Sequence, residues 1–265
     1  MELQVLVSTM HQKDYKLLDE MNIQSDTIII NQTDVNSYEE FFYHGNKIRF
    51  FSFTERGIGL SRNNALMRAT AEISLFADDD VVYKDNYKQL ICDVFNRLQD
   101  ADIIIFNVPS MNSKRSYSST TKTTRVRWFN CLKYGAVRMA VKTESVKKAN
   151  VFFSLLFGGG AKYSAGEDSL FIFDCIKKGL KVYSVPIEIG KVKQEKSTWF
   201  EGYTDKYFID KGVFFATLSK KWAYLLCIQF VLRHRQLFKE SKNSKEALKL
   251  MFSGIKQVKY SNLNY

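Results

Sequence analysis

The stretch Ile73-Ser74-Leu75-Phe76-Ala77-Asp78-Asp79-Asp80 joins an apolar run to three consecutive aspartates. The apolar run predicts a buried strand, and α/β folds bind their ligands at the carboxyl ends of strands. Three adjacent carboxylates repel one another, so folding alone gives no reason for them. They suit Mg²⁺ or Mn²⁺, because these ions prefer oxygen ligands and share them with substrate phosphates. The alternative is an acidic turn before a helix N-terminus, where Asp is also favoured.

Short apolar runs on both sides of this stretch alternate with helical patterns. The order β-α-β-α-β predicts an α/β sheet with right-handed crossover helices. Further strands are predicted at Gln4–Ser8, Thr27–Ile30, Lys47–Phe53, Ile103–Val108, Arg125–Phe129, Ala136–Val141 and Lys181–Ile187. Helices are predicted at Lys13–Met21, Gly57–Ala69, Asp85–Leu98, Glu144–Ala149 and Ser169–Lys178, with a helical turn at Tyr38–Tyr43.

The composition is that of an ordinary globular protein, with 45% hydrophobic and 25% charged residues in a chain of 265. The N-terminal residues lack the features of a signal peptide. No run approaches the roughly 20 apolar residues of a membrane span. The four cysteines show no pairing pattern, and Cys92 and Cys175 are expected to be buried thiols. These features predict a cytoplasmic protein.

Positive charge is concentrated in the C-terminal third, where residues 181–265 contain 16 Lys and Arg against 7 Asp and Glu. Past residue 200 the pattern is helical, amphipathic and basic, which predicts an anionic partner. An anionic membrane surface and a nucleic acid both fit the charge. The segment Phe214–Leu232 has basic edges; it fits a helix lying on a membrane and equally a helix packed on the catalytic domain. Aromatic residues lie among these charges at Trp199, Phe200, Tyr203, Tyr207, Phe208, Phe214, Phe215 and Trp222.

A second acidic site, Glu167-Asp168, follows the glycine-rich segment Phe157–Gly160 and opens a predicted helix. Ordinary helix capping explains such a pair when it stands alone. Paired with the cluster Asp78–Asp80, it suits a displacement reaction. A metal ion at the cluster would neutralise a departing phosphate, and the distant carboxylate would take a proton from an attacking hydroxyl.

The segment Glu55–Ala65 combines glycines, arginine and an asparagine pair at the start of a helix. Backbone N–H groups there, together with Arg62, would suit phosphate or ribose oxygens. The segment is neither a G-x-G-x-x-G nor a Walker A motif, so it supports neither a dehydrogenase nor a P-loop ATPase. A plain turn followed by a solvated Arg62 is the alternative. Residues 110–124 form a long Ser/Thr/Lys-rich loop, either functional or a surface excursion.

The segment Arg56–Ala65, the run Leu75–Asp80 and the tripeptide Gly166-Glu167-Asp168 resemble, in this order, the motifs of family 2 glycosyltransferases. The resemblance covers residues 1 to about 190. It implies a GT-A fold, with a single Rossmann-like mixed β-sheet flanked by helices and a C-terminal helical extension. We therefore expect a catalytic domain at 1–195, with a nucleotide-sugar-binding half (1–108) and an acceptor-binding half (125–195), and a basic aromatic helical extension at 196–265.

The resemblance also implies roles for individual residues. Asp168 would be the base that deprotonates the acceptor hydroxyl, and Glu167 would help to position the acceptor. Asp80 would bind the Mg²⁺ or Mn²⁺ ion that bridges the donor diphosphate, and Asp78 would contact the nucleotide ribose or a residue that orients it. The implied substrate-binding residues are Ser8, Thr9, Asn31, Gln32, Arg62, Asn63, Asp78, Asp79 and Glu167.

The chain departs from the family at two strand ends. Ser8-Thr9-Met10-His11 replaces the usual Pro-x-Tyr/Phe-Asn turn, and Asn31-Gln32-Thr33-Asp34 replaces Asp-Asp-Gly-Ser. An amide offers both a donor and an acceptor to a nucleobase edge, so the base stays open, with a UDP-sugar favoured. The Q-x-x-R-W motif of processive synthases is absent from the sequence. This favours transfer of a single sugar.

The sequence therefore predicts a metal-dependent, inverting glycosyltransferase of the hexosyltransferase type. It would move one sugar from a nucleotide-sugar to a hydroxyl of a glycan or lipid-linked acceptor, in cell-surface polysaccharide biosynthesis. We expect no nucleic-acid partner, and peripheral contact at the inner face of the plasma membrane is left as an option. Two rival functions remain: a nucleotidyltransferase, and a non-catalytic, basic nucleic-acid-binding protein.

Overall fold

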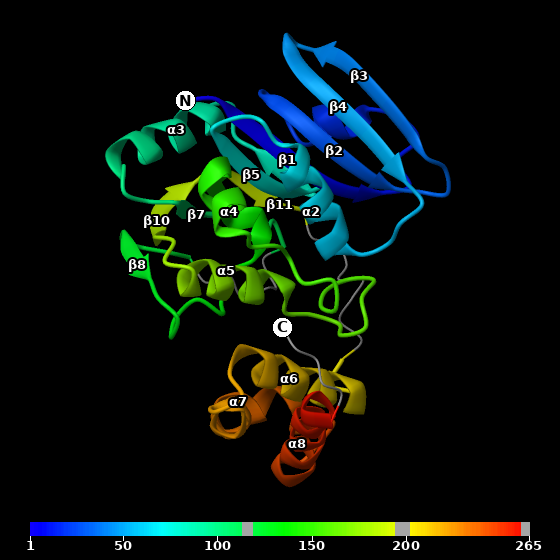
Figure 1. Ribbon diagram of the computed structural model, residues 1–265, viewed down its shortest axis with the longest axis vertical. Helices are drawn as coiled ribbons and strands as arrows, with labels where there is room; N and C mark the ends of the chain where they lie inside the picture. Colours follow the sequence, from blue (N-terminus) through cyan, green and yellow to red (C-terminus); the bar gives the residue numbers. More distant parts are fainter. Residues whose placement is uncertain (113–118, 194–201, 261–265) are drawn as a thin grey trace. The chain divides into compact units, whose positions relative to one another are not determined.

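The computed structural model describes residues 1–112, 119–193 and 202–260. Part of the loop 110–124, together with Trp199 and Phe200, lies outside these residues. The chain divides into two compact units (Figure 1). The first comprises Met1–Ala161 and Glu167–Lys196, and the second comprises Lys162–Gly166 and Ser197–Tyr265.

Within the described part of the first unit, a 9-stranded mixed sheet has the order β3-β4-β2-β1-β5-β9-β7-β10-β8. Strands β4, β2, β1 and β5 are parallel to one another, and so are β7 and β10. A separate two-stranded sheet pairs β6 with β11. The mixed sheet confirms the predicted α/β class. The strands are β1 Leu3–Met10, β2 Asp26–Gln32, β3 Ser37–Tyr43, β4 Asn46–Phe53, β5 Ile73–Asp78, β6 Val81–Tyr83, β7 Ile103–Asn107, β8 Thr124–Val126, β9 Met139–Lys142, β10 Val182–Glu188 and β11 Gly190–Val192.

Helices cover both faces of the large sheet. Leucines of α1 and apolar residues of α3 pack with one hydrophobic cluster, whereas α2, α4 and α5 contribute to the other. The central strands β1, β2, β5 and β7 are apolar on both faces, as is usual for strands covered on two sides. The helices of this unit are α1 Lys16–Glu20, α2 Ile58–Arg68, α3 Tyr87–Arg97, α4 Thr143–Ala149 and α5 Glu167–Lys177, with a 3₁₀ turn at Ala136–Arg138.

The helical turn predicted at Tyr38–Tyr43 is wrong, because these residues lie in strand β3. Strand β3 pairs antiparallel with β4 along its whole length. The two strands are joined by His44 and Gly45, with φ of 47° and 78°. Positive φ at both central residues is the geometry that favours a two-residue hairpin. Pairing with β4 therefore decides the structure of a segment whose own residues show no clear period.

The second unit contains α6 Asp205–Leu218, α7 Ala223–Phe238 and α8 Ser244–Tyr260. Two glycines allow α6 and α8 to approach closely. A Cβ added at Gly212 would lie 1.9 Å from the carbonyl oxygen of Met251, and one at Gly254 would lie 2.1 Å from that of Ile209. Among the described residues, no helix is both long and apolar enough to cross a membrane.

All four cysteines are buried free thiols, as predicted for Cys92 and Cys175. Burial raises the pKa of each thiol. They therefore behave as small apolar side chains.

Candidate active site

The predicted site residues of the first half of the chain lie at one edge of the large sheet. Ser8 of β1 is in register with Asp78 of β5, and Thr9 is in register with Asn31 of β2. These strands are parallel, so their carboxyl ends meet at the same edge. Gln32 follows at the end of β2. This is the edge at which α/β sheets bind ligands.

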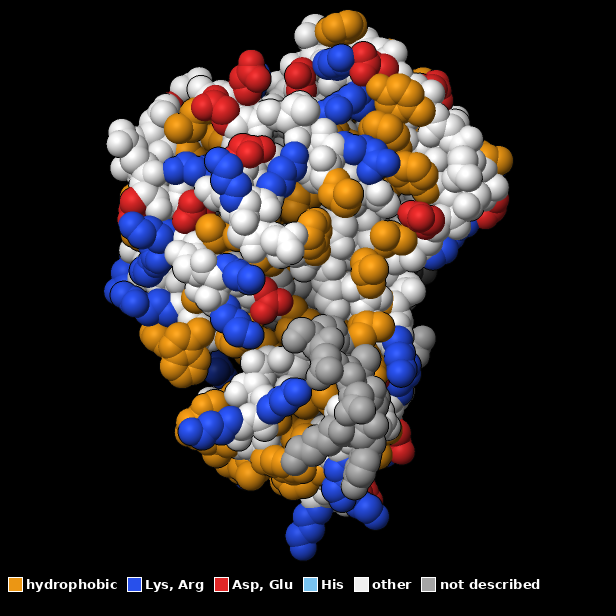
Figure 2. Space-filling model, in the orientation of Figure 1, with side chains coloured by type: hydrophobic (Ala, Val, Ile, Leu, Met, Phe, Trp, Pro, Cys, Tyr) orange, Lys and Arg blue, Asp and Glu red, His pale blue; other side chains and the backbone are white. Residues whose placement is uncertain are grey.

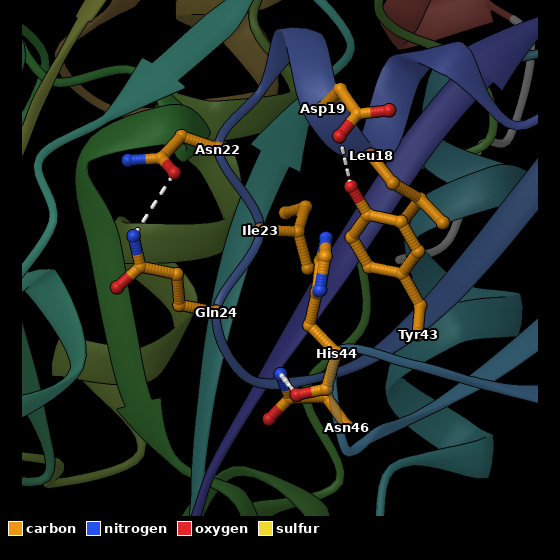
Figure 3. Close-up of a pocket in the computed structure, with 8 residues that line it drawn as sticks. All are labelled: Leu18, Asp19, Asn22, Ile23, Gln24, Tyr43, His44 and Asn46. Carbon is orange, nitrogen blue, oxygen red and sulfur yellow. Dashed lines mark hydrogen bonds between the residues drawn. The ribbon is translucent and has the colours of Figure 1, made fainter.

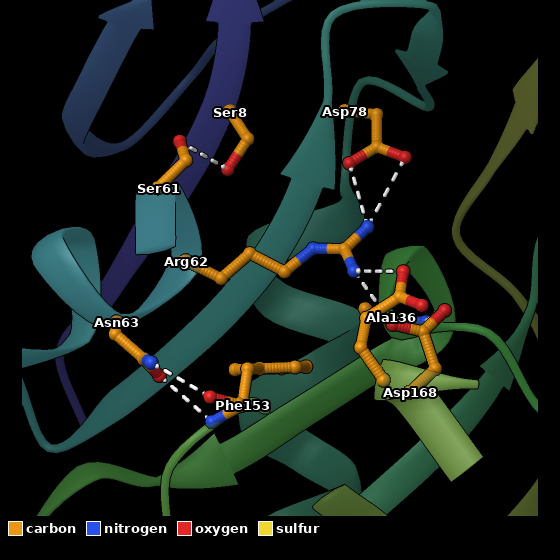
Figure 4. A network of polar contacts seen from close by, with 9 residues as sticks. Ser8, Ser61, Arg62, Asn63, Asp78, Ala136, Phe153 and Asp168 are labelled. Atoms are coloured by element: carbon orange, nitrogen blue, oxygen red, sulfur yellow. Dashed lines mark hydrogen bonds and ion pairs between the residues drawn. The ribbon is translucent and has the colours of Figure 1, made fainter. Parts of the chain in front are cut away.

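Arg62 of α2 connects Asp78 to the second acidic pair (Figure 4). Its Nη2 lies 3.0 Å from Asp78 Oδ1, and its Nη1 lies 2.6 Å from Asp168 Oδ1 and 3.2 Å from Glu167 Oε1. We refer to these four residues as the Arg62 cluster. Asp78 and Asp168 are 90 positions apart in the sequence, and one guanidinium group holds both.

Close packing at the start of α2 places Arg62. A Cβ added at Gly59 would lie 2.4 Å from the carbonyl oxygen of Ser154, so only glycine allows this approach. Asn63 then forms two hydrogen bonds with the backbone of Phe153: its Nδ2 donates to the carbonyl at 2.9 Å, and its Oδ1 accepts from the N–H at 2.8 Å. Ser61 donates to the hydroxyl of Ser8 at 2.9 Å. Three successive side chains of α2 are thereby fixed.

The acidic pair is fixed from its own side. The backbone N–H of Ala136 donates to Asp168 Oδ2 at 2.9 Å, while Oδ1 faces Arg62. Gly158, with a φ of +104°, lies so close to Glu167 that an added Cβ would be 2.7 Å from its carboxyl carbon. The glycine-rich segment before α5 therefore makes room for the Glu167 side chain. Both carboxylates belong to the first turn of α5, where the helix dipole favours negative charge.

Charge is unevenly balanced in the Arg62 cluster, because one buried cation faces three carboxylates. Burial, reinforced by the negative charge of Glu167, raises the pKa of Asp168 from 3.8 to about 7, and Arg62 opposes this rise. Burial lowers the pKa of Arg62, but the three carboxylates raise it by more than burial lowers it. The pKa therefore lies above its usual value, and the guanidinium stays positive. Its Nε is buried without a hydrogen-bond partner. Asp168 thus titrates near neutral pH, as suits a general base.

Asp79 belongs to a neighbouring polar cluster. Thr9 donates its hydroxyl proton to Asp79 Oδ2, and Gln12 Nε2 lies 3.3 Å from the same oxygen and 3.0 Å from Thr9 Oγ1. The amide of Asn31 is bonded to the backbone of Gln12. Gln32 Oε1 accepts the N–H of Gly57 at 2.7 Å and so ties β2 to the start of α2.

Asp80 lies in the turn between β5 and β6, and its backbone carbonyl accepts the N–H of Lys193 at 2.9 Å. Asp78 is bonded to Arg62, and Asp79 to Thr9 and Gln12. Within the described residues, no group of three His, Cys, Asp or Glu side chains is arranged to hold a metal ion by itself. A carboxylate that shares an ion with ligand phosphates and water is the usual arrangement for Mg²⁺. The oxygen donors here fit an ion held in that way.

The structure gives Arg62 and Asn63 contacts that sequence reasoning did not anticipate. The side chains of both residues are buried and bonded within the protein. Sequence reasoning also missed Gln12, the Ala136 N–H and the backbone of Phe153. Gln12 has a weak signal in the sequence, since it lies just after a strand end. The Ala136 N–H has none, because it reaches Asp168 from 32 residues away in the chain.

A second polar feature lies at the opposite edge of the sheet, near the start of β2 and the β3–β4 hairpin (Figure 3). It is a pocket of about 530 Å³ that none of the predicted site residues lines. Tyr43 closes one side by donating its hydroxyl proton to Asp19. The lining residues are Leu18, Asp19, Asn22, Ile23, Gln24, Tyr43, His44 and Asn46.

Comparison with known proteins gives matches among solved structures alone. No family model matches the chain, and no curated protein sequence matches it. The crystal structure of residues 1–349 of S. aureus TarS in complex with UDP-GlcNAc is 14% identical, with a TM-score of 0.67 over 96% of this chain and 82% of that one. The complex of the same fragment with UDP has a TM-score of 0.62 at 14% identity, over 96% and 81%. A longer TarS structure has a TM-score of 0.63 at 13% identity, over 96% of this chain and 49% of TarS.

This degree of similarity establishes the fold. TarS is a family 2 glycosyltransferase, and the large mixed sheet flanked by helices is the GT-A-like fold that it shares with this chain. The GT-A prediction made from the motifs is thereby confirmed.

Proposed function

We propose that this protein is an inverting glycosyltransferase that moves one sugar from a nucleotide-sugar to a hydroxyl group of an acceptor. The observation that carries the proposal is the Arg62 cluster, which joins all three family-like motifs at the carboxyl edge of the sheet. The shared fold supports it, since S. aureus TarS was crystallised with UDP-GlcNAc and with UDP. We propose a UDP-sugar donor and a hexosyl group on the same grounds.

Asp168 is the base in this proposal. It takes the proton of the acceptor hydroxyl while that oxygen attacks the anomeric carbon, and the bond from this carbon to the diphosphate oxygen breaks. The Ala136 N–H fixes one oxygen of Asp168 and Arg62 fixes the other. A base held in this way is oriented before the acceptor arrives. Glu167, beside it, positions the acceptor.

Asp80 would hold a Mg²⁺ or Mn²⁺ ion, whose role when bound is to neutralise the charge of the leaving diphosphate. The two preceding aspartates in the chain are held within the protein. Thr9 and Gln12 hold the carboxylate of Asp79, and Arg62 holds that of Asp78. Asp78 and Asp79 are thus kept at the strand end, where the ribose and phosphates of the donor would lie. Ser8, Asn31 and Gln32 complete this donor side, with Arg62 and Asn63 supporting it from α2.

The acceptor in this proposal is a glycan or lipid-linked saccharide of cell-surface polysaccharide biosynthesis, reached from the cytoplasmic face of the plasma membrane. The basic C-terminal third supports this part, because its charge suits an anionic surface. Among the described helices of this region, α7 and α8 carry net positive charge, whereas two Lys balance two Asp in α6.

The test measures release of the free nucleoside diphosphate from a panel of nucleotide-sugars with Mn²⁺, and donor binding by thermal shift. A donor that binds the native state alone raises the apparent stability. Asp168→Asn should keep donor binding and lower turnover by about 10²–10⁴-fold. Asp80→Asn should abolish the Mn²⁺-dependent part of donor binding. Asp174→Asn, on the same helix but outside the site, serves as the control and should change neither.

Full turnover in Asp168→Asn would overturn the assignment of the base. Release of pyrophosphate, with the sugar phosphate joined to a nucleotide, would establish a nucleotidyltransferase instead. Salt-sensitive binding of nucleic acid that Asp80→Asn leaves unchanged, without any donor binding, would favour the non-catalytic alternative.

A further inference from the structure

Helix α7 has apolar residues on two opposite faces. One face is buried within the second unit at Ala223, Cys227 and Val231, four residues apart, and ends at Phe238. The other face is solvent-exposed. It is formed by three residues at positions i, i+3 and i+7, which we call the α7 stripe: Leu225 (55% exposed), Ile228 (38%) and Leu232 (66%).

Residues at this spacing lie in a row along one side of a helix. Trp222, three residues before Leu225, adds a half-exposed indole at the start of the helix. A helix that is apolar all round is normally covered on every side. Packing with α6 and α8 accounts for one face only, so folding of the unit does not explain the α7 stripe.

The charged side chains of α7 itself and of the residues directly flanking it up to Lys239 have one sign. Residues 219–239 contain five Lys and Arg and no Asp or Glu. Arg235 and Lys239 continue the same spacing after the stripe, and Lys221 lies in the turn just before the helix. On the second unit, Figure 2 shows hydrophobic side chains beside Lys and Arg side chains near α7. An exposed apolar row flanked by cations is the pattern of a helix that lies in a membrane interface.

We propose that α7 binds the surface of an anionic membrane, with the α7 stripe and Trp222 inserted at the headgroup boundary and the flanking Lys and Arg on lipid phosphates. The inference deepens the proposed function and rests on it in one respect, namely that a lipid-linked acceptor lies at that surface. Binding itself needs no catalysis. It is therefore measured independently of transfer.

Two other occupants fit less well. A second copy of the chain would bring two sets of five positive charges together, and like charges disfavour such an interface. A nucleic acid would satisfy the cations, but nucleic-acid surfaces stack bases on aromatic rings, and the stripe consists of Leu and Ile. An anionic lipid surface complements both the apolar row and the charge.

The experiment measures co-sedimentation of the full-length protein with vesicles. One set is pure phosphatidylcholine, and the other is an equal mixture with phosphatidylglycerol. Binding should require phosphatidylglycerol and weaken at high salt. Leu225→Gln with Leu232→Gln should lower the partition coefficient about a hundredfold, since two apolar side chains lose their burial. Lys221→Gln with Arg235→Gln should lower it about fivefold per charge.

Leu237→Gln is the matched control, because Leu237 is 62% exposed on the same helix but lies off the stripe spacing. It should leave partitioning unchanged. The inference is overturned if the wild type ignores anionic vesicles, if Leu237→Gln weakens binding as much as the double variant, or if the double variant loses only self-association in sedimentation. Release of nucleoside diphosphate from donor alone should stay the same in the stripe variants. A vesicle result of either sign therefore does not decide whether the protein is a transferase.

Discussion

The Arg62 cluster and the α7 stripe depart from ordinary folding in opposite ways. The cluster buries the Arg62 guanidinium against three partly buried carboxylates, although charges are rarely buried without need. The stripe exposes three large apolar side chains in a row, although such rows are usually covered. Neither arrangement is the one that packing alone would favour. The charge network and the exposed apolar row are therefore the two features on which our two proposals rest.

The largest expected effect sharpens this contrast through stability. Arg62→Met removes the cation and leaves three carboxylates facing one another, which should destabilise the protein by about 3–5 kcal/mol. The stability of Arg62→Lys should lie between those of the wild type and Arg62→Met, because an ammonium group cannot hold both Asp78 and Asp168 in the same geometry. Leu232→Gln, in the α7 stripe, should stay within about 0.5 kcal/mol of wild type. The measurement is the free energy of unfolding of the three variants and the wild type, obtained by denaturant titration.

If Arg62→Met were as stable as Leu232→Gln, the cluster would not be the tightly coupled unit that its distances describe. Its function would then have to be argued from the separate strand ends alone.

The sequence predicts those site residues that belong to local motifs. Asp78, Glu167 and Asp168 each follow a strand or open a helix, so their place at the sheet edge follows from the pattern. The contacts of Arg62 do not, because its guanidinium could face solvent or the interior with the same local sequence. Its position depends on the close approach of Gly59 to Ser154, which is a tertiary contact.

The same difference holds for the fold, where some strands are predicted from the sequence and others are not. The apolar runs of β1, β2 and β5 gave the sheet, because strands buried on both faces have a strong signal. Strand β3 was missed, since its residues are mostly exposed and its structure comes from pairing with β4. The available signal in the sequence was Gly45, because glycine readily adopts the positive φ that this turn requires. The α7 stripe needed the structure, because only the packing with α6 and α8 shows which apolar face is left over.

The next effect tests the contact that places the cluster. Gly59→Ala adds a methyl group 2.4 Å from the carbonyl oxygen of Ser154, so backbone must shift. We expect a loss of about 1–3 kcal/mol in spite of the better helix propensity of alanine. Gly159→Ala is the control, because an added Cβ there meets nothing within 4 Å. Thermal unfolding separates the two, and equal stability would show that α2 can move away from Ser154 at no cost.

A smaller effect uses pH to separate the two regions. The pKa of Asp168 is raised from 3.8 to about 7, mainly by burial. The kcat/KM for the donor should therefore rise by about tenfold per pH unit below 7 and level off above it. The protein binds this proton more tightly when folded, so the free energy of unfolding should fall as pH rises from about 4 to about 7. Asp168→Asn should lack this fall.

Vesicle binding through the α7 stripe should stay constant between about pH 6.5 and 8, because Lys and Arg keep their charge throughout this range. Burial, together with Arg233 and Lys211, lowers the pKa of His234, which favours its neutral form. If the vesicle partition followed the same curve as turnover, the two regions would not be independent.

The smallest effect lies at the margin of the active site. Thr9→Val removes the hydroxyl that donates to Asp79 and leaves Gln12 as the neighbour of that carboxylate. Losing one such hydrogen bond costs about 1 kcal/mol, so donor affinity should fall about fivefold. Thr27→Val, at the opposite end of the sheet, removes a hydroxyl that donates to the carbonyl of Ser25 at 3.0 Å. It should lower stability to a similar extent and leave donor affinity unchanged. Calorimetric titration of donor into both variants checks this, and equal affinities would mean that Asp79 needs no orientation by Thr9.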